Sequence, residues 1–198
     1  MTLLARYPLH LLAALLLFAQ LAIGLRALVP EVTPAYRAQF LERTDCSNPA
    51  AIGRYEPGAT VRPVFGSADA AADGIFACGW HPAAEGLWSN SGGARLLFAL
   101  PSQPAAWRLV IEAGGLVSET HPGQRVIATA NDISLGTATV TGATPTRLVF
   151  EVPPEATADG RLEIALSFPD ATSARAIGAG RERALRAIFV AAVTLTPQ

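Results

Sequence analysis

The sequence predicts an all-β fold, a sandwich or barrel, preceded by a single N-terminal transmembrane helix. One apolar segment lies near the N-terminus, and short alternating runs separated by Gly, Pro, Asn and Asp begin at about residue 55. We expect a membrane anchor or signal peptide over 1–30, a linker with a short helix over 31–55, and a β-sandwich domain over 56–198.

The apolar segment covers residues 9–25 and is interrupted only by His10 and Gln20. A helix that spans the hydrocarbon core needs about 20 residues, with about 17 as the lower limit, so this segment is a marginal span. Arg6 precedes it, which predicts a cytoplasmic N-terminus at the bacterial inner membrane and a periplasmic C-terminal domain. The alternative is secretion after cleavage of a signal peptide, because 22–24 (Ala-Ile-Gly) has the small-x-small form of cleavage sites.

Composition and cysteine content agree with export. The chain of 198 residues is 51% hydrophobic and 16% charged, with a net charge of −1. This balance argues against nucleic acid as a partner, because phosphate binding requires a basic face. Cys46 and Cys78 lie outside any CxxC motif, and in an oxidising compartment the pair predicts a disulfide bond. Two unrelated buried thiols are the alternative.

Each element of the β domain follows from a local pattern. Thr33 and Pro34 are suited to the N-cap and first position of a short helix over 34–43. Asn131 and Asp132 are typical of a tight hairpin turn. For the last run there are two alternatives, a strand and an Ala-rich helix that begins at residue 181. Its apolar and β-branched residues favour the strand. The expected strands are 60–65, 74–78, 94–100, 107–113, 124–130, 134–140, 147–152, 162–168 and 187–196.

The most distinctive segment is 79–100, which reads GWHPAAEGLWSNSGGARLLFAL. It places Trp80 and Trp88 eight residues apart, across a Pro- and Gly-containing loop that leads into a strand. Aromatic faces stack on the apolar C–H faces of sugars, and His81, Glu85 and Asn90 supply hydrogen-bonding groups. These five residues form a candidate glycan platform. The alternative is that both tryptophans fill the sandwich core and that Glu85 ties the loop to backbone N–H groups.

The pattern GW-x-P-x-x-E-G-x-W-S resembles a bacterial extracytoplasmic β-sandwich domain of uncharacterised function, found with membrane glycosyltransferases and surface-polysaccharide proteins. Weaker similarity follows in the hairpin over 122–136 and in the segment 161–185. This chain departs from the pattern of that domain at two places. Asp132 stands where the hairpin usually has glycine, and 181–183 (Arg-Glu-Arg) replaces the usual acidic-x-Arg pair. The resemblance implies a jelly-roll-like antiparallel β-sandwich in an envelope-glycan setting, with no catalytic residues to transfer.

Catalytic motifs are weak. HExxH, HxH, DxD and GxSxG patterns do not occur, so we expect no metal, no cofactor and no catalytic residue. Residues 118–121 (Ser-Glu-Thr-His) are immediate neighbours and indicate a polar turn rather than a triad. A glycosidase would need two carboxylates facing one cleft, and Glu85 with Asp132 or Glu119 is the pairing to consider.

These observations predict a non-catalytic, membrane-anchored extracytoplasmic module that binds glycan or assists surface-polysaccharide synthesis or export. Its expected partners are a glycan, the membrane through the N-terminal helix, and a membrane glycosyltransferase or export protein. One alternative is a protein-interaction ectodomain that docks on a membrane enzyme, and a carbohydrate-active enzyme is another. Four arginines near the C-terminus are either a solvated charge run or a site for acidic glycans or lipid headgroups: Arg175, Arg181, Arg183 and Arg186.

Overall fold

The computed structural model describes residues 7–27, 53–63, 74–83, 86–90, 92–101 and 105–198. The predicted short helix over 34–43, Cys46 and Glu85 lie outside these residues. The chain divides into two compact units, Met1–Arg37 and Ala38–Gln198, and each is described by itself.

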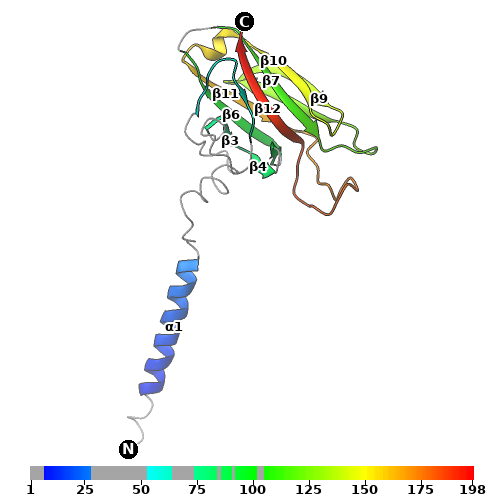
Figure 1. The fold of residues 1–198 in the computed structure, drawn as a ribbon. Coiled ribbons are helices and arrows are strands. Elements are labelled where there is room, and N and C mark those ends of the chain that lie inside the picture. The colour runs from blue at the N-terminus through cyan, green and yellow to red at the C-terminus, as the bar shows by residue number, and fades with distance from the viewer. Residues whose placement is uncertain (1–6, 28–52, 64–73, 84–85, 91, 102–104) are drawn as a thin grey trace, which may run out of the picture. The chain divides into compact units, whose positions relative to one another are not determined.

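The first unit contains helix α1 (Tyr7–Ala27), which is blue in Figure 1. Leu and Ala, both strong helix formers, dominate it. Four consecutive apolar residues, 15–18, are exposed, so apolar side chains lie on every side of the helix. Within the described residues, however, no helix has both the length and the apolar character that crossing a bilayer requires. The structure therefore confirms a helix here and does not support the predicted transmembrane span.

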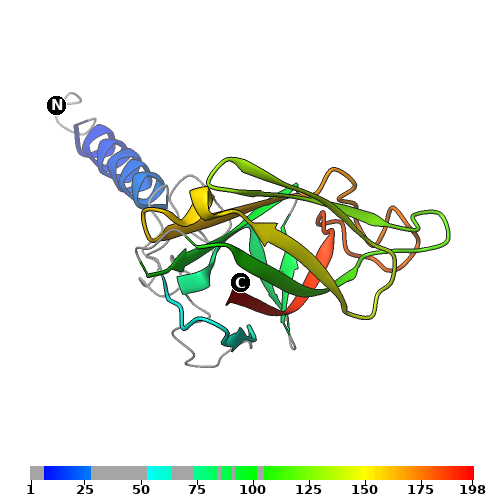
Figure 2. The same cartoon turned by 90° about the horizontal axis from the view of Figure 1, so that it is seen from above.

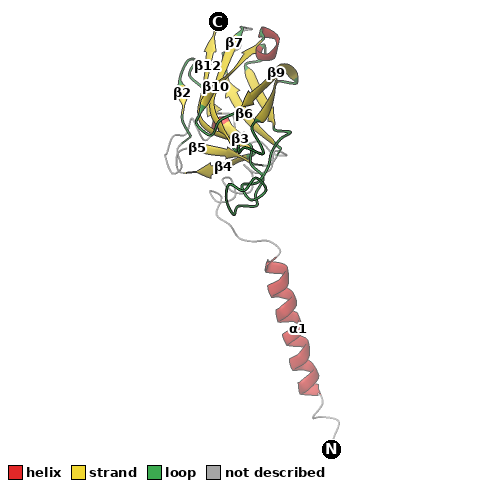
Figure 3. Cartoon of the chain, turned by 90° about the vertical axis from the view of Figure 1, so that its right-hand side faces the viewer, coloured by secondary structure: helices red, strands yellow, loops and turns green. Residues whose placement is uncertain are grey.

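The second unit is a β-sandwich, as predicted (Figures 1 and 3). The strands within the described residues form two six-stranded sheets. In the first sheet the order is β1-β6-β11-β8-β9, and β3 also pairs with β6. This sheet contains β1 (Gly53–Arg54), β3 (Phe76–Cys78), β6 (Gly93–Ala99), β8 (Gln124–Ala130), β9 (Ile133–Val140) and β11 (Arg161–Ser167).

The second sheet has the order β10-β7-β12-β5-β4, and β2 pairs with β12. All the strand pairs described are antiparallel except β1 with β6, which is parallel. A short 3₁₀-helix, η2 (Pro154–Thr157), precedes β11. The sheet contains β2 (Thr60–Val61), β4 (Trp80–Ala83), β5 (Gly86–Ser89), β7 (Trp107–Gly115), β10 (Thr146–Val152) and β12 (Ile188–Pro197).

The core lies between the two sheets, which Figure 2 shows from above. Alternation along β11 directs Leu162, Ile164 and Leu166 into this core, as their period-two spacing predicts. Full burial of each such side chain contributes about 1.5–3 kcal/mol. The ambiguous C-terminal run is a strand, β12, and its Ile188 and Val190 are fully buried.

The segment 79–90 corrects a sequence expectation, because the predicted loop is the hairpin β4–β5. At Gly79 the backbone has φ +78°, and a Cβ would lie 2.3 Å from the carbonyl oxygen of Gly93. Glycine is therefore required where the chain passes from β3 into β4. The backbone N–H of Asn90 donates to the Gly79 carbonyl oxygen at 2.7 Å and closes the base of the hairpin.

The predicted tight turn at Asn131–Asp132 is confirmed. Both residues have positive φ, 43° and 68°, as a type I′ hairpin turn between β8 and β9 requires. The Asn131 side chain also joins this turn to the start of β11. Its Nδ2 donates to the carbonyl oxygens of Ala156 and Arg161, both at 2.7 Å, and its Oδ1 accepts from the Glu163 N–H at 2.8 Å.

Two further side chains are buried near the beginning of the β domain. Tyr55 is buried with its ring edge-on to Phe98, and its hydroxyl accepts the Leu195 N–H at 2.8 Å and donates to the Ala59 carbonyl oxygen at 2.6 Å. Burial raises the pKa of Tyr55. Cys78 is fully buried in β3, and because Cys46 lies outside the described residues, the predicted disulfide stays a prediction.

Candidate functional site

Trp80 is a core residue, which corrects its assignment to a glycan platform. Its side chain is 2% exposed and lies edge-on to Phe76, with ring centroids 5.4 Å apart. The indole Nε1 donates to the carbonyl oxygen of Arg95 at 2.9 Å. Neither ring face is available to a ligand, so for Trp80 the alternative interpretation, a residue that fills the core, is correct.

Trp88 lies on the opposite face of the same sheet. Its neighbours in β5, Leu87 and Ser89, are buried, so the alternation of the strand directs Trp88 outward, where it is half-buried. Trp88 is directly opposite His81 on β4 and directly opposite Phe189 on β12. These three residues therefore form a row across three adjacent strands on the outer face of the sheet. We call His81, Trp88 and Phe189 the aromatic row.

The local sequence holds the rings of this row together. The Trp88 and Phe189 ring centroids are 5.5 Å apart, with the ring planes tilted by 57°. A Cβ on Gly86 would lie 2.6 Å from Cζ of Phe189 and 2.4 Å from the carbonyl oxygen of Val190, so glycine allows β12 and the Phe189 ring to approach β5. The Ser89 Oγ accepts the N–H groups of Ala187 and Ile188 at 2.9 and 3.0 Å, which fixes the start of β12.

Polar groups flank the aromatic row. Arg186 Nη1 donates to Asn90 Oδ1 at 3.0 Å, and Nη2 donates to Glu182 Oε1 at 3.1 Å. The Arg186 side chain is only 7% exposed, whereas that of Glu182 is 55% exposed. Partial burial and the positive charge of Arg186 lower the pKa of His81, and Glu182 opposes this shift. His81 is therefore neutral near pH 7 and can both donate and accept a hydrogen bond.

The structure brings together His81, Trp88 and Asn90 of the predicted platform, and the fourth described member, Trp80, lies on the other face. Sequence reasoning missed Phe189 and the role of Glu182. A signal for Phe189 was present, because period two in the last strand separates it from the core residues on either side. Its partner on β5 is about 100 residues earlier in the chain, and a single sequence does not reveal such a pairing.

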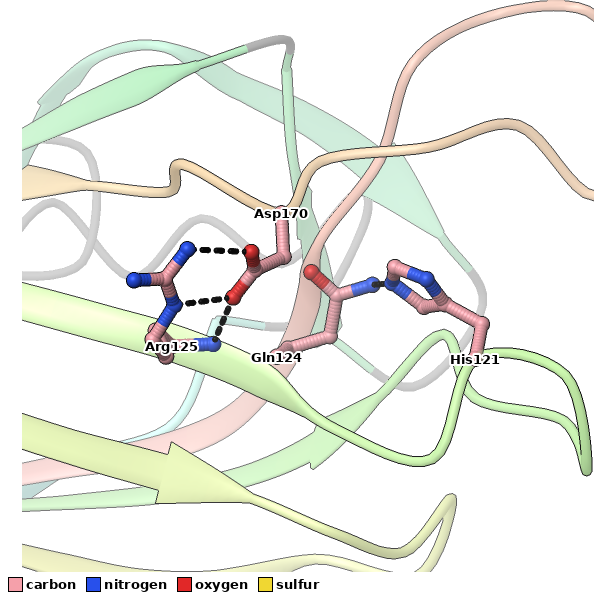
Figure 4. Close-up of polar contacts among 4 residues, drawn as sticks. All are labelled: His121, Gln124, Arg125 and Asp170. Atoms are coloured by element: carbon pink, nitrogen blue, oxygen red, sulfur yellow. Dashed lines mark hydrogen bonds and ion pairs between the residues drawn. The ribbon is translucent and has the colours of Figure 1, made fainter.

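A second polar cluster lies at the start of β8 (Figure 4). The polar turn expected over 118–121 is confirmed, since Ser118 and His121 exchange backbone hydrogen bonds of 2.9 and 3.0 Å. Gln124 Nε2 donates to the Leu116 carbonyl oxygen at 2.8 Å, which fixes the orientation of the amide because a carbonyl only accepts. The same Nε2 lies 2.8 Å from Nε2 of His121 and links the side chain of Gln124 to the 118–121 turn.

The neighbouring pair in Figure 4, Arg125 and Asp170, is a clamp between β8 and the loop after β11. The Arg125 Nε and Nη2 donate to the two Asp170 oxygens at 2.7 Å each, and the Arg125 backbone N–H donates at 3.0 Å. These hydrogen bonds from Arg125 lower the pKa of Asp170 from its ordinary value of 3.8 to about 2. Since the Ser118 hydroxyl is bonded to Thr120 and not to His121, this cluster holds loops together and shows no nucleophile–base pair.

Among the described residues, no three His, Cys, Asp or Glu side chains gather closely enough to hold a metal ion. Asp132 lies in the β8–β9 turn and Glu119 in the 118–121 turn. The carboxylate pairings that the sequence suggested both require Glu85, which lies outside the described residues.

Comparison with known proteins gives only weak similarities. No family model and no curated protein matches this chain. A family 35 carbohydrate-binding module from Clostridium thermocellum has 11% identity and a TM-score of 0.38, over 72% of this chain and 90% of that one. A family 36 module in complex with calcium and xylotriose has 13% identity and a TM-score of 0.35, over 55% of this chain and 76% of that one. At these scores the likeness carries no argument about function.

Proposed function

We propose that this protein is a non-catalytic module that binds glycans on the outer face of the β4–β5–β12 region. One observation carries the proposal: the Trp88 and Phe189 rings lie together and half-exposed on a sheet face. A soluble domain normally buries such rings in its core. Here the core already contains Trp80 and Phe76, so the outer pair is available for contact with a ligand.

The chemistry of the aromatic row suits a sugar. Sugar rings present apolar C–H faces to an aromatic ring and hydroxyl groups at their edges. The neutral His81 ring offers one donor and one acceptor, and the Asn90 amide lies beside it on the hairpin. Because Arg186 fixes both Asn90 and Glu182, these polar groups are ordered before any ligand binds, which lowers the entropy cost of binding.

The proposal assigns no proton-transfer group. The carboxylate beside the row, Glu182, accepts a hydrogen bond from the buried Arg186 guanidinium and compensates its charge. Its role is therefore to position Arg186. This arrangement favours binding without bond cleavage and makes an accessory role in surface-polysaccharide synthesis or export the preferred setting.

Binding is tested with the full-length protein in mild detergent, by retardation in native gels that contain laminarin, mannan or alginate. We expect at least one polysaccharide to retard the protein. Trp88→Ala and Phe189→Ala should each weaken that binding about tenfold, since a stacked aromatic ring contributes about 1.5 kcal/mol. Trp88→Phe should retain most of the affinity because it keeps an aromatic face.

The matched control is Val149→Ala, which removes an exposed apolar side chain from β10 of the same sheet. It should bind like the unaltered protein. Thermal unfolding of every variant separates loss of binding from loss of folding. The proposal fails if no polysaccharide retards the protein, or if Trp88→Ala and Val149→Ala behave alike.

Export remains part of the proposal. The exposed apolar surface of α1 and the two cysteines support a location outside the cytoplasm. A reporter enzyme that is active only after its own disulfides form, fused after Gln198, should be active in cells that make the fusion. Deletion of 1–27 should abolish this activity, and an active deletion fusion would argue against export through this segment.

A further inference from the structure

The connection between β11 and β12 is strongly basic. Residues 172–186, which we call the arginine loop, contain four Arg and one Glu, a net charge of +3. The whole chain has a net charge of −1, so the remainder carries −4. Figure 1 shows this loop, in orange-brown, projecting beyond the start of β12.

Backbone hydrogen bonds bring the arginines of this loop together. Thr172 and Arg186 exchange backbone hydrogen bonds of 2.9 and 2.7 Å at its base. The Arg175 N–H donates to the Glu182 carbonyl oxygen at 3.0 Å, which places Arg175 across from residues 181–183. Gly178, with φ +73°, lies in the turn between these two segments. Three side chains separated in sequence are therefore presented from one folded loop.

In the described part of the domain, most exposed arginines outside the arginine loop have an acidic partner. Arg62, Arg108, Arg125 and Arg147 each have a carboxylate partner within 4 Å, and Arg161 is the exception. The acid of the arginine loop, Glu182, is engaged by Arg186. Within the part of the chain that the structure describes, Arg175, Arg181 and Arg183 are exposed and have no ion-pair partner.

We infer that the ligand of the aromatic row is an acidic glycan, whose carboxylate or sulfate groups bind Arg175, Arg181 and Arg183. The inference rests on the proposed function. The base of the arginine loop and the aromatic row are continuous, because Arg186 bonds to Asn90 beside Trp88. A guanidinium matches a carboxylate or sulfate with two parallel hydrogen bonds, which gives geometric as well as charge selectivity.

The experiment compares two double variants of the full-length protein. Arg181→Gln/Arg183→Gln removes two charges from the arginine loop. Arg108→Gln/Arg161→Gln removes two charges near the starts of β7 and β11, about 20 Å along the strands from the site. Affinities for alginate, a polyuronate, and for neutral laminarin are measured at 50 and 200 mM salt.

We expect alginate to bind more tightly than laminarin and to bind more weakly at the higher salt. The arginine-loop variant should lose about tenfold in affinity for alginate and keep its affinity for laminarin. The control variant should stay within about twofold on both polymers. Arg175→Gln alone should weaken alginate binding in the same direction.

The outcomes separate this inference from the proposed function. Suppose that laminarin binds as tightly as alginate and that the arginine-loop variant binds alginate with the affinity of the unaltered protein. The acidic-ligand inference is then wrong, while glycan binding stands. If alginate binding requires the arginines but is unaffected by Trp88→Ala, the assignment of the glycan site to the aromatic row is wrong. If the arginine-loop variant instead loses preference for phosphatidylglycerol over phosphatidylcholine vesicles and keeps alginate binding, the arginines serve a lipid surface and the inference fails.

Discussion

Trp80 and Trp88 carry the same side chain but have opposite surroundings. Trp80 packs against Phe76 inside the sandwich, while Trp88 contacts Phe189 on the outer face. Eight residues along one uninterrupted strand would place both on the same face. The antiparallel register of β4 and β5 changes that parity, because Trp80 pairs with Ser89 and His81 pairs with Trp88. The division of roles at these residues follows from hairpin register.

The two tryptophans should therefore give opposite phenotypes. Trp80→Ala should lower the free energy of unfolding by about 3–5 kcal/mol, because it leaves a large cavity and an unpaired Arg95 carbonyl oxygen. Trp88→Ala should lower it by about 1–2 kcal/mol, since the ring is half-buried, and should lose glycan affinity. Urea unfolding and gel retardation measure the two quantities. Equal destabilisation by the two variants would contradict the assignment of Trp80 to the core.

The β8–β9 turn allows a second test at single residues. Asn131→Ala should lower the free energy of unfolding by about 2–4 kcal/mol, because it loses three hydrogen bonds and keeps a positive φ. Asp132→Gly is the matched control. Position 132 also has positive φ and is exposed, so glycine there should stabilise the protein by about 0.5–1 kcal/mol. Destabilisation by Asp132→Gly would show that the carboxylate has a role beyond the turn.

At the scale of elements, the Arg125–Asp170 clamp should make stability depend on pH in the acidic range. The pKa of Asp170 is about 2 in the folded protein and 3.8 ordinarily, so the folded state binds the proton more weakly. The contribution of the clamp is therefore fully present above about pH 4 and is lost as the pH falls toward 2. Because both side chains are partly exposed, high salt should weaken it.

The measurement is urea unfolding of the unaltered protein and of Asp170→Asn between pH 7 and pH 2.5. The variant should be less stable at pH 7, and the difference should shrink below pH 4. A difference that stays constant over this range would show that the loss comes from packing and not from the charge. Glu151→Gln, which alters the more exposed pair with Arg108, is the control.

The strands that the sequence predicted correctly are those with clear alternation and burial, such as β7, β8 and β11. The sequence predicted a loop at β4 and β5, because Gly79, Pro82 and Gly86 are typical of turns. Tertiary contacts overrode this local signal. Pairing of β5 with β12, together with the Ser89 hydroxyl bonds to the start of β12, orders a segment of weak intrinsic strand propensity.

The candidate site also contains residues that the local sequence predicts and residues that only tertiary contacts bring together. His81, Trp88 and Asn90 were predictable because one short segment contains them. Phe189, Glu182 and Arg186 reach the site only through the pairing of β5 with β12, across about 100 residues. No local pattern encodes that register, so the aromatic row as a surface becomes visible only in three dimensions.

For the whole molecule, the predicted Cys46–Cys78 disulfide should add about 3–4 kcal/mol to stability by closing a loop of about 30 residues. Mass spectrometry after alkylation, with and without a reductant, should show a mass increase for two thiols only after reduction. Cys46→Ala should destabilise the protein under non-reducing conditions and should match the unaltered protein in the presence of reductant. Alkylation of both thiols without reductant would contradict the pairing.

The position of β12 has a mechanical consequence. Phe189 lies near one end of this strand, whereas Leu195, near the other end, is bound by the Tyr55 hydroxyl at the beginning of the domain. If a glycan is held at Phe189 and the chain is held on its N-terminal side, tension runs lengthwise along β12. The β7–β12 ladder runs alongside this load path over most of the length of β12, so its hydrogen bonds hold the loaded strand in the sheet. A pull on a ligand at the proposed glycan site would thus be transmitted lengthwise through β12 to the beginning of the domain.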